Sequence, residues 1–216
     1  MPLFRRAIAV ALALAALDAF GTFSLSRPAL ADNATASLVA KPVALPDMAI
    51  GSAKAPVTIV EYSSMTCPHC AAFAENVFPM LQSKYIDTGK VRFVSREFPL
   101  DIKAAGASML ARCAANGDAQ KYFDAVAMLF KQQQELVENT TDTLKAVGDK
   151  FGMSGDAVET CEKDNTLLDK LKSDQDFAYD KLKVDATPTF FINGERVKGS
   201  MSFEEFEKKL APLLKR

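Results

Sequence analysis

The chain has 216 residues, of which 49% are hydrophobic and 25% charged, a composition that suits one globular domain or two small ones. Its 26 basic and 27 acidic residues give a formal net charge of −1, and no block of basic residues stands out. This balance argues against a nucleic-acid partner, because binding to a phosphate backbone depends on clustered Lys and Arg.

The N-terminus has the pattern of a secretory signal peptide. Two arginines precede an apolar run over 7–17, and a small-x-small sequence, Ala-Leu-Ala, ends at Ala31. Asp18 interrupts the apolar run, which is shorter than the ~20 residues that a membrane-spanning helix needs. We therefore predict a signal peptide over 1–31, cleaved after about Ala31, rather than an uncleaved membrane anchor.

A flexible leader is predicted over 32–50, because this segment holds Ala, Thr, Ser and two prolines with little periodicity. A compact domain is expected over 51–216. Its first strand is predicted at 57–62, where the sequence VTIVEY is mostly apolar, as in a buried strand.

The middle of the chain is predominantly helical. A helix is predicted over 71–85, with a kink at Pro79, and a second strand over 91–98. From about 101 to 183 the pattern is helical throughout, and Asn-Gly, Phe-Gly and Ser-Gly pairs predict the turns between about four or five helices. We expect this segment, 101–183, to be an insertion in the domain.

The C-terminal part predicts a hairpin and a last helix. Strands at 189–192 and 195–198 flank an Asn-Gly turn, and Ser202 with Glu205 forms the capping box of a helix. The order strand, helix, strand, helical insertion, hairpin, helix predicts an α/β protein: a thioredoxin fold with an inserted helical domain.

The most informative motif is Cys67-Pro68-His69-Cys70, directly after the first strand. At a helix start, unpaired backbone N–H groups and the helix dipole stabilise an anion, so the pKa of Cys67 should be lowered. Cys70 lies one turn further in and would resolve a mixed disulfide. Pro68 suits the first turn, and His69 can add positive charge beside Cys67, which would make the disulfide a stronger oxidant.

Glu61 lies six residues before Cys67, near the end of the apolar strand. Burial beneath the active-site helix would raise its pKa towards the range useful for proton transfer with Cys70. The alternative is a glutamate on an edge strand that faces water. We favour the buried acid, because the strand itself has a buried pattern.

A Cys-x-x-Cys pair can also be half of a zinc site. The chain has no second such pair, and His69 is its only histidine, so a zinc site would need a distant cysteine or a carboxylate. We therefore expect no metal and no cofactor.

Two further sequences complete a family pattern: Thr187-Pro188 precedes the hairpin, and Arg-Glu-Phe-Pro occupies 96–99. With Cys-Pro-His-Cys, the upstream glutamate and the helical insertion, the chain resembles the DsbA-like thiol–disulfide oxidoreductases. The sequence at 96–99 resembles the subgroup common in α-proteobacteria. The likeness covers nearly all of 51–216.

The resemblance implies a role for each matching residue. Cys67 matches the family's nucleophile, Cys70 its resolving cysteine and Glu61 its buried acid. Pro188 matches a cis-proline that faces the cysteine pair and helps to hold extended substrate peptides, and Thr187 matches the residue before it. Thr187 departs from the best-known oxidases, which carry Val there, and is similar to the isomerases and reductases of the family.

Cys113 and Cys161 both lie in the helical insertion. An even cysteine count in an exported protein favours pairing, so we predict a structural disulfide between them. The alternative is two buried free thiols on apolar helix faces.

We expect a periplasmic enzyme that donates its Cys67–Cys70 disulfide to reduced or partly unfolded exported proteins. The resemblance implies a DsbB-like membrane quinone reductase as its reoxidant. One alternative is an isomerase or reductase of the same fold, kept reduced by a membrane electron donor. Another is a non-catalytic holdase or binding module that uses the apolar surface around the motif.

Overall fold

The computed structural model describes residues 29–41 and 43–215, with side chains described from residue 34 onward. A five-stranded mixed sheet is at its centre, in the strand order β1-β3-β2-β4-β5. The strands are β1 (Met48–Ile50), β2 (Val57–Ser63), β3 (Val91–Glu97), β4 (Thr189–Ile192) and β5 (Glu195–Lys198). The helices are α1 (Ala29–Val39), α2 (Pro68–Asn76), α3 (Phe78–Leu81), the π-helical turn η1 (Gln82–Ile86), α4 (Ile102–Ala115), α5 (Ala119–Lys131), α6 (Gln133–Glu138), α7 (Thr140–Lys150), α8 (Gly155–Glu162), α9 (Asn165–Leu182) and α10 (Phe203–Leu213).

The predicted fold class is confirmed: β2 and β3 run parallel in the middle of the sheet, and β4 and β5 form an antiparallel hairpin beside β2. The register places Glu61 of β2 beside Ser95 of β3. Side chains of successive strand residues point to opposite faces, so these two polar side chains share one face of the sheet.

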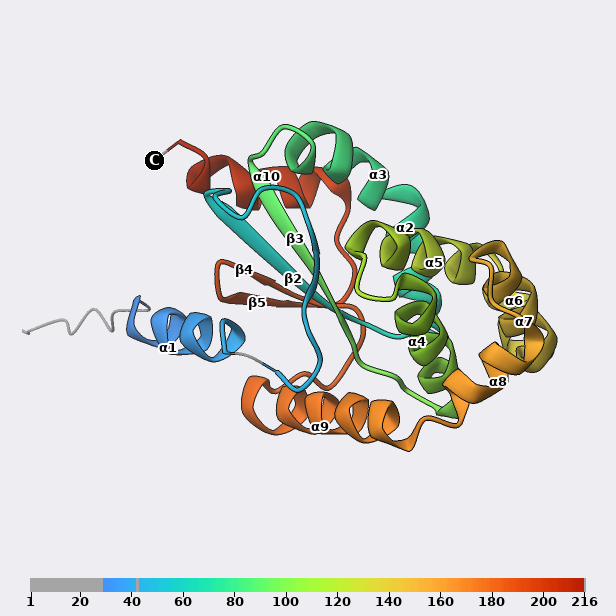
Figure 1. Cartoon of the computed structure of the whole chain (residues 1–216). Coiled ribbons are helices and arrows are strands. Elements are labelled where there is room, and N and C mark those ends of the chain that lie inside the picture. The colour runs from blue at the N-terminus through green and yellow to red at the C-terminus, as the bar shows by residue number, and fades with distance from the viewer. Residues whose placement is uncertain (1–28, 42, 216) are drawn as a thin grey trace, which may run out of the picture.

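Each face of the sheet has its own covering helices (Figure 1). On one face, Ile59 and Phe93 pack with Phe73 of α2 and Phe206 of α10 in the larger core cluster. The opposite face packs against α9 and α1 in a second cluster, whose members are Val39, Val60, Tyr62, Val94, Phe98, Ala178, Leu182, Val184 and Phe191. The helices α4 to α8 gather at one end of the sheet (Figure 1), so the insertion lies beside the end of β2 from which α2 starts.

The prediction of a flexible leader over 32–50 is wrong for the described part of this segment. It contains the helix α1 and the strand β1, and β1 pairs antiparallel with β3. The backbone N–H groups of Ala44 and Leu45 donate to the carboxylate of Asp174 in α9, at 2.6 and 2.9 Å. These partners lie far along the chain, so local sequence could not reveal them. Most of the predicted signal peptide, 1–28, lies outside the described residues.

The helix predicted over 71–85 is divided into α2, α3 and η1. The break falls at Val77, and Pro79 lies in the first turn of α3. A backbone N–H in the first turn has no acceptor within the helix, so a proline there loses no hydrogen bond. The first helix begins at Pro68, with Cys67 as its N-cap residue, which agrees with the prediction that the motif lies at a helix start.

The insertion holds six helices, α4 to α9, instead of the four or five expected. The additional helix is the short α6, which is separated from α7 by Asn139 alone, without a glycine or proline to mark the boundary. The strands β4 and β5 have the predicted bounds, and Ser202 and Glu205 form the predicted capping box. Within the described ranges, no helix is both long enough and apolar enough to cross a membrane.

Candidate active site

The two cysteines of the motif lie at the start of α2 and differ in their access to solvent. Cys67 is the N-cap residue, with extended backbone, and Pro68 occupies the first helical turn. Cys67 is 5% exposed and Cys70 is fully buried. Both are free thiols in this structure. The exposed part of the pair thus belongs to Cys67, and an attacking group can reach Cys67 more easily than Cys70.

The pKa of Cys67 is lowered to about 5. The hydrogen bond with the Cys70 thiol is the largest cause, and partial burial opposes it. Thr187 and the backbone N–H groups of Cys70 and His69 lower the pKa further. Hydrogen bonds to the charged form of a group favour ionisation, as does the N-terminal end of a helix. Cys67 is therefore a thiolate at neutral pH.

Cys70 has the opposite electrostatic environment. Burial raises its pKa far above the usual range of a thiol, and its hydrogen bond to Cys67 and the charge of Glu61 raise it further. Two thiols three residues apart thus have opposite preferences: Cys67 for the anion and Cys70 for the protonated form.

The segment before β4 closes over Cys67. The Thr187–Pro188 peptide bond is cis, and the sulfur of Cys67 lies 3.3 Å from the carbonyl oxygen of Thr187. The Thr187 hydroxyl is buried and has no hydrogen-bond partner among the described residues. Thr187 and Pro188 therefore lie against the cysteine pair, as the family resemblance implied.

Glu61 is a buried acid, and it does not face water from an edge strand. It lies in the central strand β2, is 6% exposed, and its Oε1 atom has no hydrogen-bond partner among the described residues. Burial raises its pKa to about 8; the nearby Ser63 hydroxyl opposes the shift and the charge of Cys67 adds to it. At neutral pH the carboxyl group is mostly protonated and can donate a proton.

The two middle residues of the motif are exposed. Pro68 and His69 lie on the solvent side of the first turn of α2. The backbone N–H of His69 forms a hydrogen bond with the Cys67 sulfur, which lowers the pKa of Cys67.

Sequence reasoning missed a side chain that binds the reactive loop. The amide nitrogen Nε2 of Gln133, in the first turn of α6, donates to the carbonyl oxygens of Met65 and Cys67 at 2.9 and 3.0 Å. The loop is also attached to α4, because the Thr66 hydroxyl donates to Asp101, at 2.6 Å, and Asp101 is the N-cap of α4. Neither Gln133 nor Asp101 belongs to the cysteine motif, so only the tertiary structure identifies them as partners of the reactive loop.

The Arg-Glu-Phe-Pro sequence has a structural explanation. Glu97 of β3 accepts two hydrogen bonds from Arg112 of α4, at 2.6 and 2.8 Å, and one from the Tyr122 hydroxyl of α5, at 2.8 Å. Its neighbour Arg96 points to the other face of the sheet and binds Asp47 of the leader at 2.7 and 3.0 Å. These consecutive side chains therefore attach both the helical insertion and the leader to β3.

Cys113 of α4 and Cys161 of α8 are joined by a disulfide, and their Cα atoms lie 6.3 Å apart. Cys161 packs with Leu171 of α9 in a small apolar cluster. Among the described residues, no three His, Cys, Asp or Glu side chains are grouped as metal ligands.

The comparisons with known proteins agree with this geometry. The family model described as "Thioredoxin" matches residues 44–211. A Rickettsia bellii protein, provisionally named a protein-disulfide oxidoreductase, is 34% identical over 150 residues, which are 68% of this chain and 57% of that protein. This chain thus spans little more than half the length of the Rickettsia relatives that it matches. Disulfide bond formation protein D of Bacillus subtilis is 27% identical over 171 residues, 77% of this chain and 76% of that one.

A solved structure extends the likeness to nearly a whole protein. The crystal structure of α-DsbA1 from Wolbachia pipientis is 32% identical in sequence and matches with a TM-score of 0.75, over 84% of this chain and 96% of that one. The family model and this structure together cover the sheet, the helical insertion and the cysteine motif. The chain therefore belongs to the thioredoxin family and, within it, to the DsbA-like proteins.

Proposed function

We propose that this protein is a thiol–disulfide oxidoreductase that donates its Cys67–Cys70 disulfide to reduced proteins during oxidative folding. The observation that carries the proposal is the pKa of Cys67, lowered to about 5 at the N-terminus of α2. A stabilised thiolate favours the reduced form of the pair, and a pair whose reduced form is stabilised is a strong oxidant.

The reaction would proceed in two exchanges. A substrate thiolate attacks the Cys67 sulfur of the disulfide, and Cys70 leaves with the bonding electrons and takes a proton from Glu61. A second substrate thiolate then attacks the substrate sulfur of the mixed disulfide, and Cys67 leaves as a thiolate. Two electrons pass from the substrate to the cysteine pair, one proton is held by Cys70, and the other is released to solvent.

Apolar side chains beside the reactive loop suit a partly unfolded substrate. Leu100 is 53% exposed and Ile102 is 76% exposed, and the Leu100 backbone N–H is bonded to Ser64, three residues before Cys67. Both line a groove between the start of α4 and α9. Because folded proteins bury such side chains in their cores, an unfolded segment could cover Leu100 and Ile102 with its own apolar residues.

We place this chemistry outside the cytoplasm, in the periplasm. The signal-peptide pattern at the N-terminus and the Cys113–Cys161 disulfide support an oxidising compartment. Each turnover leaves the cysteine pair reduced, so the protein needs an electron acceptor. The family likeness supports a DsbB-like membrane quinone reductase as this acceptor.

The test is oxidation of a reduced dithiol peptide by the purified protein and two single variants. Cys67→Ser should lose dithiol oxidation, because the protein would have no Cys67–Cys70 disulfide for the substrate thiolate to attack. Cys70→Ser, supplied instead with the disulfide form of the peptide, should accumulate mixed disulfides at Cys67, because the Cys67 thiolate attacks the peptide disulfide and no resolving thiol releases the product. Dithiol oxidation by Cys67→Ser at the rate of the unchanged protein would contradict the assignment.

Thr187 supports a second candidate, a disulfide isomerase or reductase of the same fold. The support comes from the resemblance, because the isomerases and reductases carry Thr where the best-known oxidases carry Val, and the Thr187 carbonyl oxygen lies 3.3 Å from the Cys67 sulfur. The redox state of Cys67 and Cys70 in cells, trapped by alkylation, separates the two candidates. A mostly oxidised pair supports the oxidase, and a mostly reduced pair supports the isomerase or reductase.

A further inference from the structure

The loop that precedes Cys67 is held by a series of hydrogen bonds that ends at the N-terminus of α4. The Thr66 hydroxyl donates to Oδ2 of Asp101, at 2.6 Å. The Ser64 hydroxyl lies 3.4 Å from the Thr66 hydroxyl and accepts from the backbone N–H of Leu100, at 3.2 Å. These contacts join the reactive loop to a segment that lies 35 positions further along the chain.

The direction of each bond in this series follows from the number of protons available. A hydroxyl group has one proton, and that of Thr66 is donated to the Asp101 carboxylate. Thr66 can therefore only accept from Ser64, so the Ser64 hydroxyl donates to Thr66 while it accepts from Leu100. The series ends on a charged acceptor. Hydrogen bonds from a hydroxyl to a carboxylate are shorter and roughly twice as strong as those between neutral groups.

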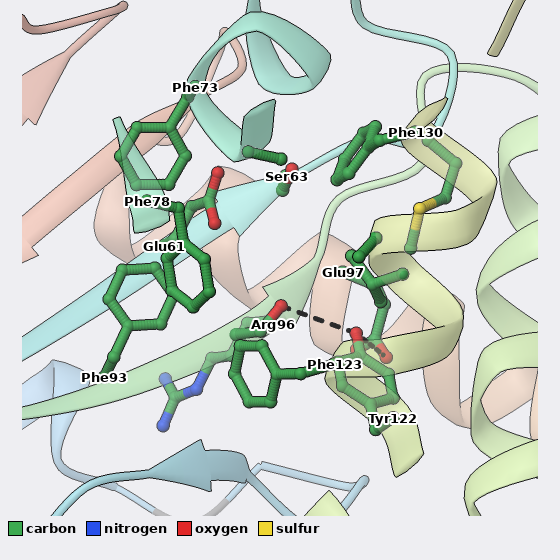
Figure 2. Close-up of a pocket in the computed structure, with 15 residues that line it drawn as sticks. Glu61, Ser63, Phe73, Phe78, Phe93, Arg96, Glu97, Tyr122, Phe123 and Phe130 are labelled. Atoms are coloured by element: carbon green, nitrogen blue, oxygen red, sulfur yellow. Dashed lines mark hydrogen bonds between the residues drawn. The ribbon is translucent and has the colours of Figure 1, made fainter. Parts of the chain in front are cut away.

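Asp101 lies in a segment that is itself bound at both ends. Its Oδ1 atom caps α4 by accepting from the backbone N–H of Ala104, at 2.8 Å. At the other end of the segment, Figure 2 shows the Tyr122 hydroxyl at the carboxylate of Glu97, which Arg112 also binds. The connection between β3 and α4 is thus fixed to the helical insertion, and Asp101 can act as a firm support for the reactive loop.

The reactive loop in turn contacts both cysteines of the motif. The carbonyl oxygen of Ser64 accepts from the backbone N–H of Cys67, at 3.1 Å. The backbone N–H of Ser64 forms a hydrogen bond with the Cys70 sulfur, which opposes the rise in the pKa of Cys70. Cys67 keeps the extended backbone of an N-cap residue, with φ −84° and ψ 117°, and this conformation lets its side chain meet the N–H groups of the first turn. Thr66 immediately precedes Cys67, so its bond restrains this conformation.

We propose that Asp101 is a positioning residue for the thiol–disulfide exchange, and that its bond to Thr66 holds Cys67 where the first turn of α2 stabilises the thiolate. The inference rests on the proposed function and deepens it, because the helical insertion then tunes the oxidant together with the Cys-Pro-His-Cys motif. Asp101 lines the same groove as Leu100 and Ile102, so the groove proposed for the substrate contains the residue that supports the reactive loop.

Thr66→Val tests the bond, because it removes the hydroxyl with little change in side-chain shape. The equilibrium of the cysteine pair with glutathione should shift towards the disulfide by about tenfold, since the lost bond has a charged acceptor. The pKa of Cys67, followed by thiolate absorbance, should rise. Thr66→Ser keeps the hydroxyl and should restore both values. Thr88→Val is the matched control, because the exposed Thr88 hydroxyl bonds to the carbonyl oxygen of Lys84 in η1.

Asp101→Ser separates the cap of α4 from the support of the loop. Serine still caps a helix, but it presents no second oxygen to Thr66. This variant should shift the glutathione equilibrium as Thr66→Val does. The double variant should shift it no further than either single variant, because both lose the same bond. If Asp101 acted through its negative charge alone, Asp101→Ser would instead lower the pKa of Cys67.

Three results would overturn the inference. One is a Thr66→Val protein equal to Thr88→Val in both the pKa of Cys67 and the glutathione equilibrium. The others are a lower pKa of Cys67 in Asp101→Ser, and a double variant whose shift is the sum of the two single shifts. The glutathione equilibrium needs no protein substrate, so failure of the unchanged protein to oxidise the dithiol peptide would contradict the proposed function and not the positioning role.

Discussion

At the scale of single residues, the site depends on how three titratable groups are buried. Cys67 receives hydrogen bonds at a helix N-terminus, and its pKa falls to about 5. Cys70 and Glu61 are buried without compensating charge, so the pKa of each rises. The motif and the strand pattern predicted the direction for Cys67 and Glu61. The contact with Thr187 came only from the family resemblance, because 120 residues separate the two positions.

The raised pKa of Glu61 predicts a pH-dependent stability. As a neutral acid Glu61 stabilises the folded protein fully below its ordinary pKa, and this stabilisation is lost as the pH rises to about 8. Glu61→Gln stays neutral at every pH. In the oxidised form, the variant and the unchanged protein should unfold with similar free energies near pH 4. Near pH 9 the variant should be more stable by about 2–5 kcal/mol.

Urea denaturation at a series of pH values checks this expectation. A constant difference between the two proteins from pH 4 to pH 9 would show that Glu61 is not a buried acid with a raised pKa.

At the scale of elements, local signals were sufficient where a helix or strand is defined by its own residues. The hairpin β4–β5 and the Ser202–Glu205 capping box are examples. Local signals failed where an element depends on distant partners. The strand β1 exists because β3 pairs with it, and the active-site loop is held by Gln133 from α6.

Gln133→Ala should loosen the reactive loop, because the carbonyl oxygens of Met65 and Cys67 lose their shared donor. Loss of these bonds should cost about 1–2 kcal/mol of unfolding free energy, and amide hydrogen exchange should accelerate over 64–70. Gln134→Ala is the matched control, since the Gln134 side chain, within the part of the chain that the structure describes, donates to the exposed Glu138 and not to the reactive loop. Equal exchange rates over 64–70 in the two variants would exclude Gln133 from positioning the loop.

The Cys113–Cys161 disulfide belongs to the packing of α4 against α8. It closes a segment with a sequence separation of 48 residues, so replacing both cysteines with Ala should lower the free energy of unfolding by about 2–4 kcal/mol. Dithiol oxidation should largely persist, because neither residue touches the Cys67–Cys70 pair. Peptide mapping of the oxidised protein provides the check: a bridge from Cys113 or Cys161 to the active-site cysteines would contradict a structural role.

At the scale of the whole molecule, β3 connects the parts of the chain. Glu97 binds Arg112 of the insertion and Arg96 binds Asp47 of the leader, on opposite faces of the sheet. The order of elements predicted the fold class, because a strand–helix–strand unit followed by a hairpin allows few arrangements. It could not predict the ordered leader, whose contacts with β3 and α9 depend on side chains that only the folded chain brings together.

The central claim is that the stabilised Cys67 thiolate makes this cysteine pair an oxidant. The equilibrium of Cys67 and Cys70 with mixtures of reduced and oxidised glutathione at neutral pH, followed by alkylation and mass analysis, tests it most directly. The account predicts that the dithiol form predominates until oxidised glutathione is in clear excess. A pair that stays disulfide-bonded in mostly reduced glutathione would contradict it.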